Sequence, residues 1–151
     1  MSVRVANPAD AKVGELVSSA GPRARALGVK DAARRAPVVV LATPWAAARS
    51  ALASAGELSG KVLLGCINPL AADLSGLLIS HTSSREEQVA SWAAGARVVK
   101  IFNTTGFGNM ASPRYPEGPA CMLYRGDDAA AKATAARLAS DLGFDPIDAG
   151  P

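Results

Sequence analysis

Three apolar runs, each ending in a short polar or proline-bearing turn, constrain the fold of this chain more than any other feature. They read VVVLATPW, LLGCINPL and VVKIFNTTG, and helical patterns separate them. The first run, Val38 to Thr43, shows no alternation of apolar and polar residues and is flanked by prolines. That pattern is typical of a strand buried on both faces of a parallel sheet. An α/β fold is the first expectation.

The alternation of strand and helix extends along the whole chain. Val3 to Ala6 predicts a strand, and Asn7 predicts the N-cap of a helix that begins at Pro8 and ends near Ala20. A short strand or turn and a short helix, GPRARALG and VKDAARRA, come next. Trp45, Ala48, Ala51 and Leu52 recur at helical spacing after Pro44, and further strands are expected at KVLLGCI, RVVKIFN, ACMLYRG and FDPIDAG.

The later helices carry their own boundary signals. Ser84 followed by Glu87 forms a capping pattern, and Asp127 and Gly143 predict the N-cap and the stop of the last helix. Two long loops are expected, Asn68 to Ser84 and the segment TTGFGNMASPRYPEGP, and loops of that length are usually functional. Together the signals predict one domain over residues 1–151, built as a doubly wound, mostly parallel sheet.

Composition excludes several classes of function. The 151 residues are 49% hydrophobic and 19% charged with a net charge of +3, which fits a globular chain. The basic stretch GPRARALGVKDAARR has no interleaved aromatic residues, so nucleic-acid binding is not expected. No apolar run is long enough to cross a bilayer, and the N-terminus lacks the apolar core of a signal peptide, so a cytoplasmic location is expected. Cys66, Cys121 and His81 lack metal-ligand spacing, and both cysteines are expected to be buried free thiols.

The carboxyl ends of the three apolar strands are expected to face one crevice, because ligands of doubly wound sheets bind there. Amide and hydroxyl groups would line it and could bind a carboxamide, a ribose or a carbonyl. The residues are Trp45, Asn68, Asn103, Thr104 and Thr105. A purely structural alternative stays open for Asn68 and Asn103, which could cap turns ahead of Pro69 and Thr104.

From Asn7 to Pro151 the chain resembles the NADPH-dependent reductases of the deazaflavin coenzyme F(420). The matching segments are VVVLATPW, LSGKVLLGCINPL, DLSGL, HTSSREEQVASWAAGARVVKIFNTTG, NMASPRY, GDDAAAKATAARLASDLGF and PIDAGP. The Rossmann domain of this family is also similar to those of pyrroline-5-carboxylate reductase and of the six-transmembrane metalloreductases. The resemblance implies a Rossmann-like fold and hydride transfer between NADP and a deazaflavin ring.

The resemblance also implies roles for individual residues. No catalytic acid or base is implied, because the two cofactors carry the chemistry and the protein aligns them. Asn7, within the segment ANP, stands beside the position that holds the 2′-phosphate of NADP. The nicotinamide ribose and the reacting rings would lie against Thr43, Pro44, Trp45, Asn68 and Pro69. The pocket of the second substrate would be bordered by His81, Thr82, Asn103, Thr104 and Thr105, although a loop histidine is more often simply solvated.

The chain departs from the family at both ends. The family opens with a strand and a GxGxxG turn that hold the pyrophosphate, and its first βα unit is missing here. Val5 and Ala6 stand where the family usually has an arginine for the 2′-phosphate. The family continues beyond the position of Pro151 into helices that complete the active site and the dimer, so a homodimer stays an open expectation.

The missing strand would lie between Val3 to Ala6 and Val38 to Thr43 in the order of the sheet. Three arrangements are open: the flanking strands pair directly, a partner chain fills the gap, or the natural protein starts upstream of Met1. A truncated or misassigned start is the hypothesis. Two functions compete, an NADP-dependent oxidoreductase and a degenerate Rossmann module that acts only in protein interaction.

Overall fold

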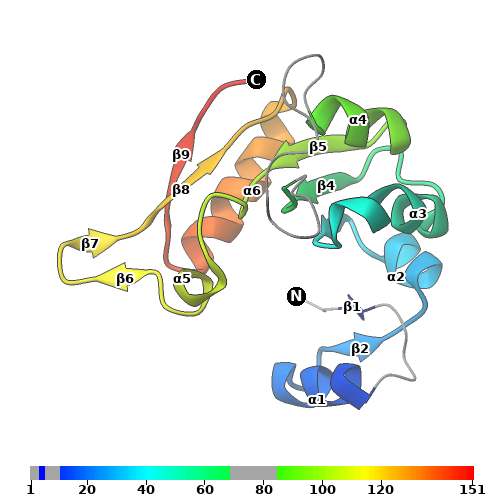
Figure 1. The fold of residues 1–151 in the computed structure, drawn as a ribbon, viewed down its shortest axis with the longest axis horizontal. Helices are drawn as coiled ribbons and strands as arrows, with labels where there is room; N and C mark the ends of the chain where they lie inside the picture. The colour runs from blue at the N-terminus through cyan, green and yellow to red at the C-terminus, as the bar shows by residue number, and fades with distance from the viewer. Residues whose placement is uncertain (1–3, 6–10, 69–84) are drawn as a thin grey trace.

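The computed structural model describes residues 4–5, 11–68 and 85–151 (Figure 1). The helices are α1 (Ala11–Ala20), α2 (Val29–Arg35), α3 (Trp45–Ala55), α4 (Arg85–Trp92), α5 (Phe107–Ala111) and α6 (Ala129–Asp141). The strands are β1 (Arg4–Val5), β2 (Arg25–Ala26), β3 (Val38–Leu41), β4 (Val62–Gly65), β5 (Arg97–Lys100), β6 (Arg114–Tyr115), β7 (Gly118–Pro119), β8 (Cys121–Tyr124) and β9 (Asp145–Asp148). The predicted capping residues Asn7 and Ser84 and most of the loop from Asn68 to Ser84 lie outside the described residues.

The centre of the molecule is a parallel sheet of order β3-β4-β5, formed by the three predicted apolar strands. Val39 pairs with Leu63, and Leu63 pairs with Val98. Side chains alternate between the two faces of a strand, and each face of β4 contacts a different core. Leu63 lies in one cluster with residues of α3 and α4, whereas Leu64 lies in a second cluster with residues of α6. The expected α/β fold with helices on both faces of the sheet is confirmed.

Small side chains bring α6 close to the sheet. Ala131, Ala135 and Ala139 follow one another every four residues along a single face of α6, and all three are fully buried. Asp128 is the N-cap residue of α6, and its Oδ1 accepts a hydrogen bond of 2.7 Å from the amide of Ala131. The prediction of Asp127 as N-cap is therefore wrong by one residue, because the amide that needs a partner is three residues beyond Asp128.

The sheet continues past β5 through an antiparallel contact. Lys100 and Arg125 form a β-bridge and exchange backbone hydrogen bonds of 2.9 and 3.1 Å. β9 then pairs in parallel with β8, and α6 packs against both strands. The segment TTGFGNMASPRYPEGP, predicted as a loop, instead contains α5 and the antiparallel pair β6–β7. These elements have two to five residues each, too short for a periodic pattern to reveal.

β1 and β2 form a separate parallel pair. β1 contacts α2 and β2 contacts α1, and Figure 1 shows the pair between these two helices. Within the described residues neither strand pairs with β3, so the structure does not show direct pairing of the flanking strands, which was one of the three open arrangements. Among the described residues, β3 is an edge strand of the central sheet. Pro37 and Leu41 accept hydrogen bonds from β4 and its following turn, so the backbone groups of Val38 and Val40 point away from β4.

Burial agrees with this open edge. The Val40 side chain is 55% exposed, which contradicts the prediction that the first apolar strand is buried on both faces.

Cys121 is also exposed, so the expectation of burial is wrong for this thiol, whereas Cys66 is half-buried. Burial raises the pKa of the Cys66 thiol to about 12. No helix of the described residues has the length and apolar character needed to span a membrane.

Candidate functional site

The structure brings the predicted site residues of β3, β4 and β5 to one edge of the sheet. Thr43 follows β3, Asn68 follows β4 and Asn103 follows β5, and the three strands run parallel. The expectation that their carboxyl ends meet is confirmed. Four other predicted site residues lie outside the described part of the chain: Asn7, Pro69, His81 and Thr82.

Asn68 and Asn103 join the ends of two neighbouring strands. Asn68 Nδ2 donates to the backbone oxygen of Asn103 at 2.9 Å, and Asn103 Nδ2 donates to Asn68 Oδ1 at 3.1 Å. Two hydrogen bonds over 35 positions of sequence hold the two amides in a defined orientation. The structural alternative that these residues only cap local turns does not account for this reciprocal contact.

Two acceptors at this edge are buried without a partner. Thr43 Oγ1 and Asn103 Oδ1 make no hydrogen bond among the described residues, although each atom is inaccessible to solvent. A buried polar atom without a partner costs about 1–3 kcal/mol, so folded proteins rarely keep one without a function. Both oxygens can accept a hydrogen bond from a bound molecule that reaches the carboxyl ends of β3 and β5.

The backbone before Asn103 is strained. Phe102 has a φ of +63°, in the left-handed region that bulky side chains rarely adopt. Its ring lies against Phe144, with centroids 6.5 Å apart, and Phe144 is buried. Strain of this kind costs about 1–3 kcal/mol and is common at binding sites. Packing on Phe144 therefore fixes a turn that directs Asn103 toward Asn68.

The turn after β3 is held differently. Pro44 is the exposed N-cap residue of α3, and the Trp45 ring lies against Trp92 of α4 with centroids 5.3 Å apart. Trp45 packs against the buried cluster that contains Leu63. Its side chain therefore anchors α3, and the contact predicted with a nicotinamide ribose stays a prediction for this turn.

The turn after β5 carries a polar network that sequence reasoning missed. Thr105 Oγ1 accepts a 2.7 Å hydrogen bond from Asn109 Nδ2, and the Tyr115 hydroxyl donates to Asn109 Oδ1. Thr104 Oγ1 lies 3.8 Å from Met122 Sδ. The network ties α5 and β6 to the candidate site. No spacing rule could reveal it, because the short elements that bring Tyr115 back to Asn109 have no periodic signal.

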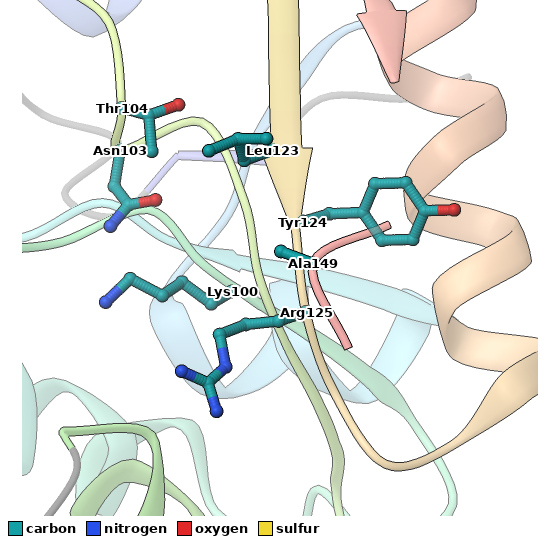
Figure 2. Close-up of a pocket in the computed structure, with 7 residues that line it drawn as sticks. All are labelled: Lys100, Asn103, Thr104, Leu123, Tyr124, Arg125 and Ala149. Atoms are coloured by element: carbon teal, nitrogen blue, oxygen red, sulfur yellow. The ribbon is translucent and has the colours of Figure 1, made fainter. Parts of the chain in front are cut away.

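A cavity of about 170 Å³ adjoins the same turn (Figure 2). Its lining comes from the end of β5, from β8 and from the residue after β9. The residues are Lys100, Asn103, Thr104, Leu123, Tyr124, Arg125 and Ala149. Figure 2 shows the Lys100 and Arg125 side chains extending to the same side, while the Tyr124 hydroxyl points away. Sequence reasoning also missed these two basic residues, because they are 25 positions apart.

A parallel sheet covered on both faces, with polar side chains gathered where its strands end, defines a Rossmann-like domain. Residues 1–69 match the family model described as NADP oxidoreductase coenzyme F420-dependent. This match confirms the resemblance seen in the sequence. No cluster of histidine, cysteine and acidic residues that could hold a metal ion occurs in the described ranges.

Known proteins support the same class. A proposed F420-dependent NADP-reductase from Arthrobacter sp. FB24 is 36% identical, with a TM-score of 0.78 over 87% of this chain and 63% of its own. The hypothetical protein SMa0349 from Sinorhizobium meliloti is 27% identical, with a TM-score of 0.83 over 93% of this chain and 68% of its own. Metalloreductase STEAP3 of Rattus norvegicus is 32% identical over 123 residues, 80% of this chain. The chain spans only 24% of that metalloreductase.

Proposed function

We propose that this domain binds NADPH at the carboxyl edge of its central sheet and aligns it for hydride transfer to a second substrate of the deazaflavin type. The observation that carries the proposal is the pair of buried, unpartnered oxygens, Thr43 Oγ1 and Asn103 Oδ1, at the ends of two parallel strands. The family match and the similar reductase from Arthrobacter support the cofactor and the deazaflavin.

The residues present suit the nicotinamide half of the cofactor. A carboxamide N–H and ribose hydroxyls are donors, and the unpartnered atoms of Thr43 and Asn103 are acceptors. When bound, NADPH supplies the hydride, so the protein needs to position two ring systems and exclude water. Asn68 holds the Asn103 amide in place, and the strained turn at Phe102 limits its movement. This alignment is the role we assign to the edge of the sheet.

The test is a fluorescence titration of the purified chain with NADPH. We expect saturable binding with a dissociation constant below about 1 mM, which corresponds to a binding free energy of about −4 kcal/mol. Thr43→Val and Asn103→Ala each remove one acceptor and should weaken binding about 3- to 10-fold, the value of one hydrogen bond. Thr134→Val is the matched control, because the Thr134 hydroxyl bonds to the Ala130 carbonyl within α6 and should not affect binding. Absence of saturation at millimolar NADPH would refute the proposal.

A second candidate is a non-catalytic module that binds a protein partner through β3. The observation that favours it is the open edge of β3 with the exposed Val40 side chain, because unpaired strand edges pair with other chains. This candidate predicts no saturable NADPH binding, and the same titration therefore separates it from the oxidoreductase.

A further inference from the structure

The strand pair β8–β9 exposes an apolar face that the proposed binding of NADPH does not use. α6 packs against one side of both strands, and Met122 and Phe144 are buried on that side. Leu123 and Ile147 are directly opposite each other in the register of the pair and lie on the other side. Their side chains are 43% and 41% exposed. Because parallel strands are usually covered on both faces, this face has the character of a surface that another molecule covers.

Opposite charges mark the two ends of this face. Arg125 follows β8 on the same side as Leu123, as Figure 2 shows. Asp145 begins β9 on the same side as Ile147. The register pairs Asp145 with Cys121, so four residues, or about 13 Å, separate Asp145 from Arg125 along the strands. The two side chains are too far apart to pair within one copy, and neither makes an ion pair among the described residues.

The face is complementary to itself. A twofold axis that lies in the plane of the contact and crosses the strands places the Arg125 end of one copy over the Asp145 end of the other. The contact then holds two symmetric pairs of arginine and carboxylate around a centre formed by Leu123 and Ile147 of both copies. Arg125 Nη2 donates to the carbonyl oxygen of Pro151, and the guanidinium group has further N–H groups for a carboxylate.

The edge of β9 is less suited to pairing than the face. Among the described residues β9 is the outer strand of its pair, because β8 is the strand that continues to the bridge with β5. Pro146 in the middle of β9 has no backbone N–H, and Asp145 and Asp148 are charged. Proline and charged side chains prevent an edge strand from pairing with another chain. A second copy would therefore approach the face of the pair.

We propose that the β8–β9 face, formed by Leu123, Ile147, Arg125 and Asp145, is the interface of a homodimer. A second copy covers the apolar centre and supplies the opposite charge at each end. This interface is independent of cofactor binding, so the outcome of an NADPH titration does not decide it.

The test is the mass of the purified chain in solution, measured by sedimentation at concentrations from about 1 μM to about 1 mM. We expect the mass to rise from 15.3 kDa toward twice that value. Ile147→Lys places like charges at the centre and should weaken the dimer at least about tenfold. Val40→Lys is the matched control, because Val40 is an exposed apolar residue of β3, outside this face, and its replacement should leave the dimer unchanged.

Two charge reversals identify the contact itself. Arg125→Glu and Asp145→Arg each bring like charges together at both ends of the dimer, so each variant alone should dimerise at least about tenfold more weakly. In an equimolar mixture of the two variants, both ends of a mixed dimer again hold opposite charges. We expect this mixture to form a heterodimer with about the affinity of the unchanged chain.

Thermal unfolding of each variant confirms that it is folded before its association is interpreted. The mass of a single chain up to about 1 mM would overturn the interface. So would a mixture of the two charge reversals that associates no better than either variant alone. A dimer that Val40→Lys disrupts and Ile147→Lys does not would assign the contact to the edge of β3 and overturn the proposal.

Discussion

Replacing Asn68 by alanine should destabilise the protein more than replacing its partner Asn103. Asn68→Ala removes both hydrogen bonds between the ends of β4 and β5, the one to the Asn103 backbone oxygen and the one from Asn103 Nδ2. It also leaves the side-chain amide of Asn103 without a hydrogen bond among the described residues, because Nδ2 loses its acceptor and Oδ1 already has no partner. Asn103→Ala removes a single bond together with the unpartnered oxygen, and the bond from Asn68 to the backbone oxygen remains.

The difference can be estimated from these contacts. Two hydrogen bonds at about 0.5–1.5 kcal/mol each, together with a stranded amide, give about 2–4 kcal/mol for Asn68→Ala. The single bond gives about 0.5–1.5 kcal/mol for Asn103→Ala. For a chain of 151 residues, Asn68→Ala should lower the melting temperature by about 5–10 °C.

The assay is urea unfolding of the two single variants and the double variant. Both single variants lose the bond from Asn103 Nδ2 to Asn68 Oδ1, and the double variant has no stranded amide. Its loss of unfolding free energy should therefore fall about 2 kcal/mol short of the sum of the single losses. Thr134→Val, on the surface of α6, should change the free energy by less than about 0.5 kcal/mol. Equal losses for both single variants, or strict additivity, would refute the reasoning that a reciprocal amide pair joins the two strands.

Three further predictions follow from the burial and the sequence of single residues. Leu63→Ala, at a fully buried position, should lower the free energy of unfolding by about 2–5 kcal/mol in urea, whereas Val40→Ala on the open edge should cost less than about 1 kcal/mol. A thiol reagent at pH 8 should label exposed Cys121 rapidly and Cys66 only on unfolding. Burial raises the pKa of Cys66 from 9.0 to about 12, so the unfolded thiol ionises first and the free energy of unfolding should fall as the pH rises from about 9 toward 12. Without an arginine at Val5, NADPH should bind less than about tenfold tighter than NADH in parallel titrations.

Sequence reasoning predicted the central sheet because its strands are long apolar runs that must be buried. The same reasoning placed Asn68 and Asn103 at one edge, since parallel strands bring their carboxyl ends together, whereas Thr43 was indicated by the family resemblance. It could not predict the exposure of Val40, because burial of an apolar strand depends on neighbours that a local pattern does not show. The β-bridge between Lys100 and Arg125 was equally out of reach, because it depends on the register of two distant strands.

The short elements after β5 were missed for a different reason. α5 and the β6–β7 pair have no repeating apolar face, and their place is fixed by contacts such as the hydrogen bond from Tyr115 to Asn109.

The N-cap of α6 shows that a capping pattern in the sequence locates the start of a helix only to within one residue. Two adjacent aspartates, Asp127 and Asp128, fit the same pattern, and only the bond to the Ala131 amide distinguishes them.

Mapping NADPH binding onto the backbone tests the central claim most directly. Amide shifts of the isotopically labelled chain are recorded during titration with NADPH. Binding at the carboxyl edge of the sheet predicts saturable shifts concentrated at Thr43, Asn68 and the turn from Phe102 to Thr105, with little change at the opposite end of β4, near Val62. Shifts spread evenly over the surface, or no saturable shift at millimolar NADPH, would contradict the claim that this edge is a cofactor site.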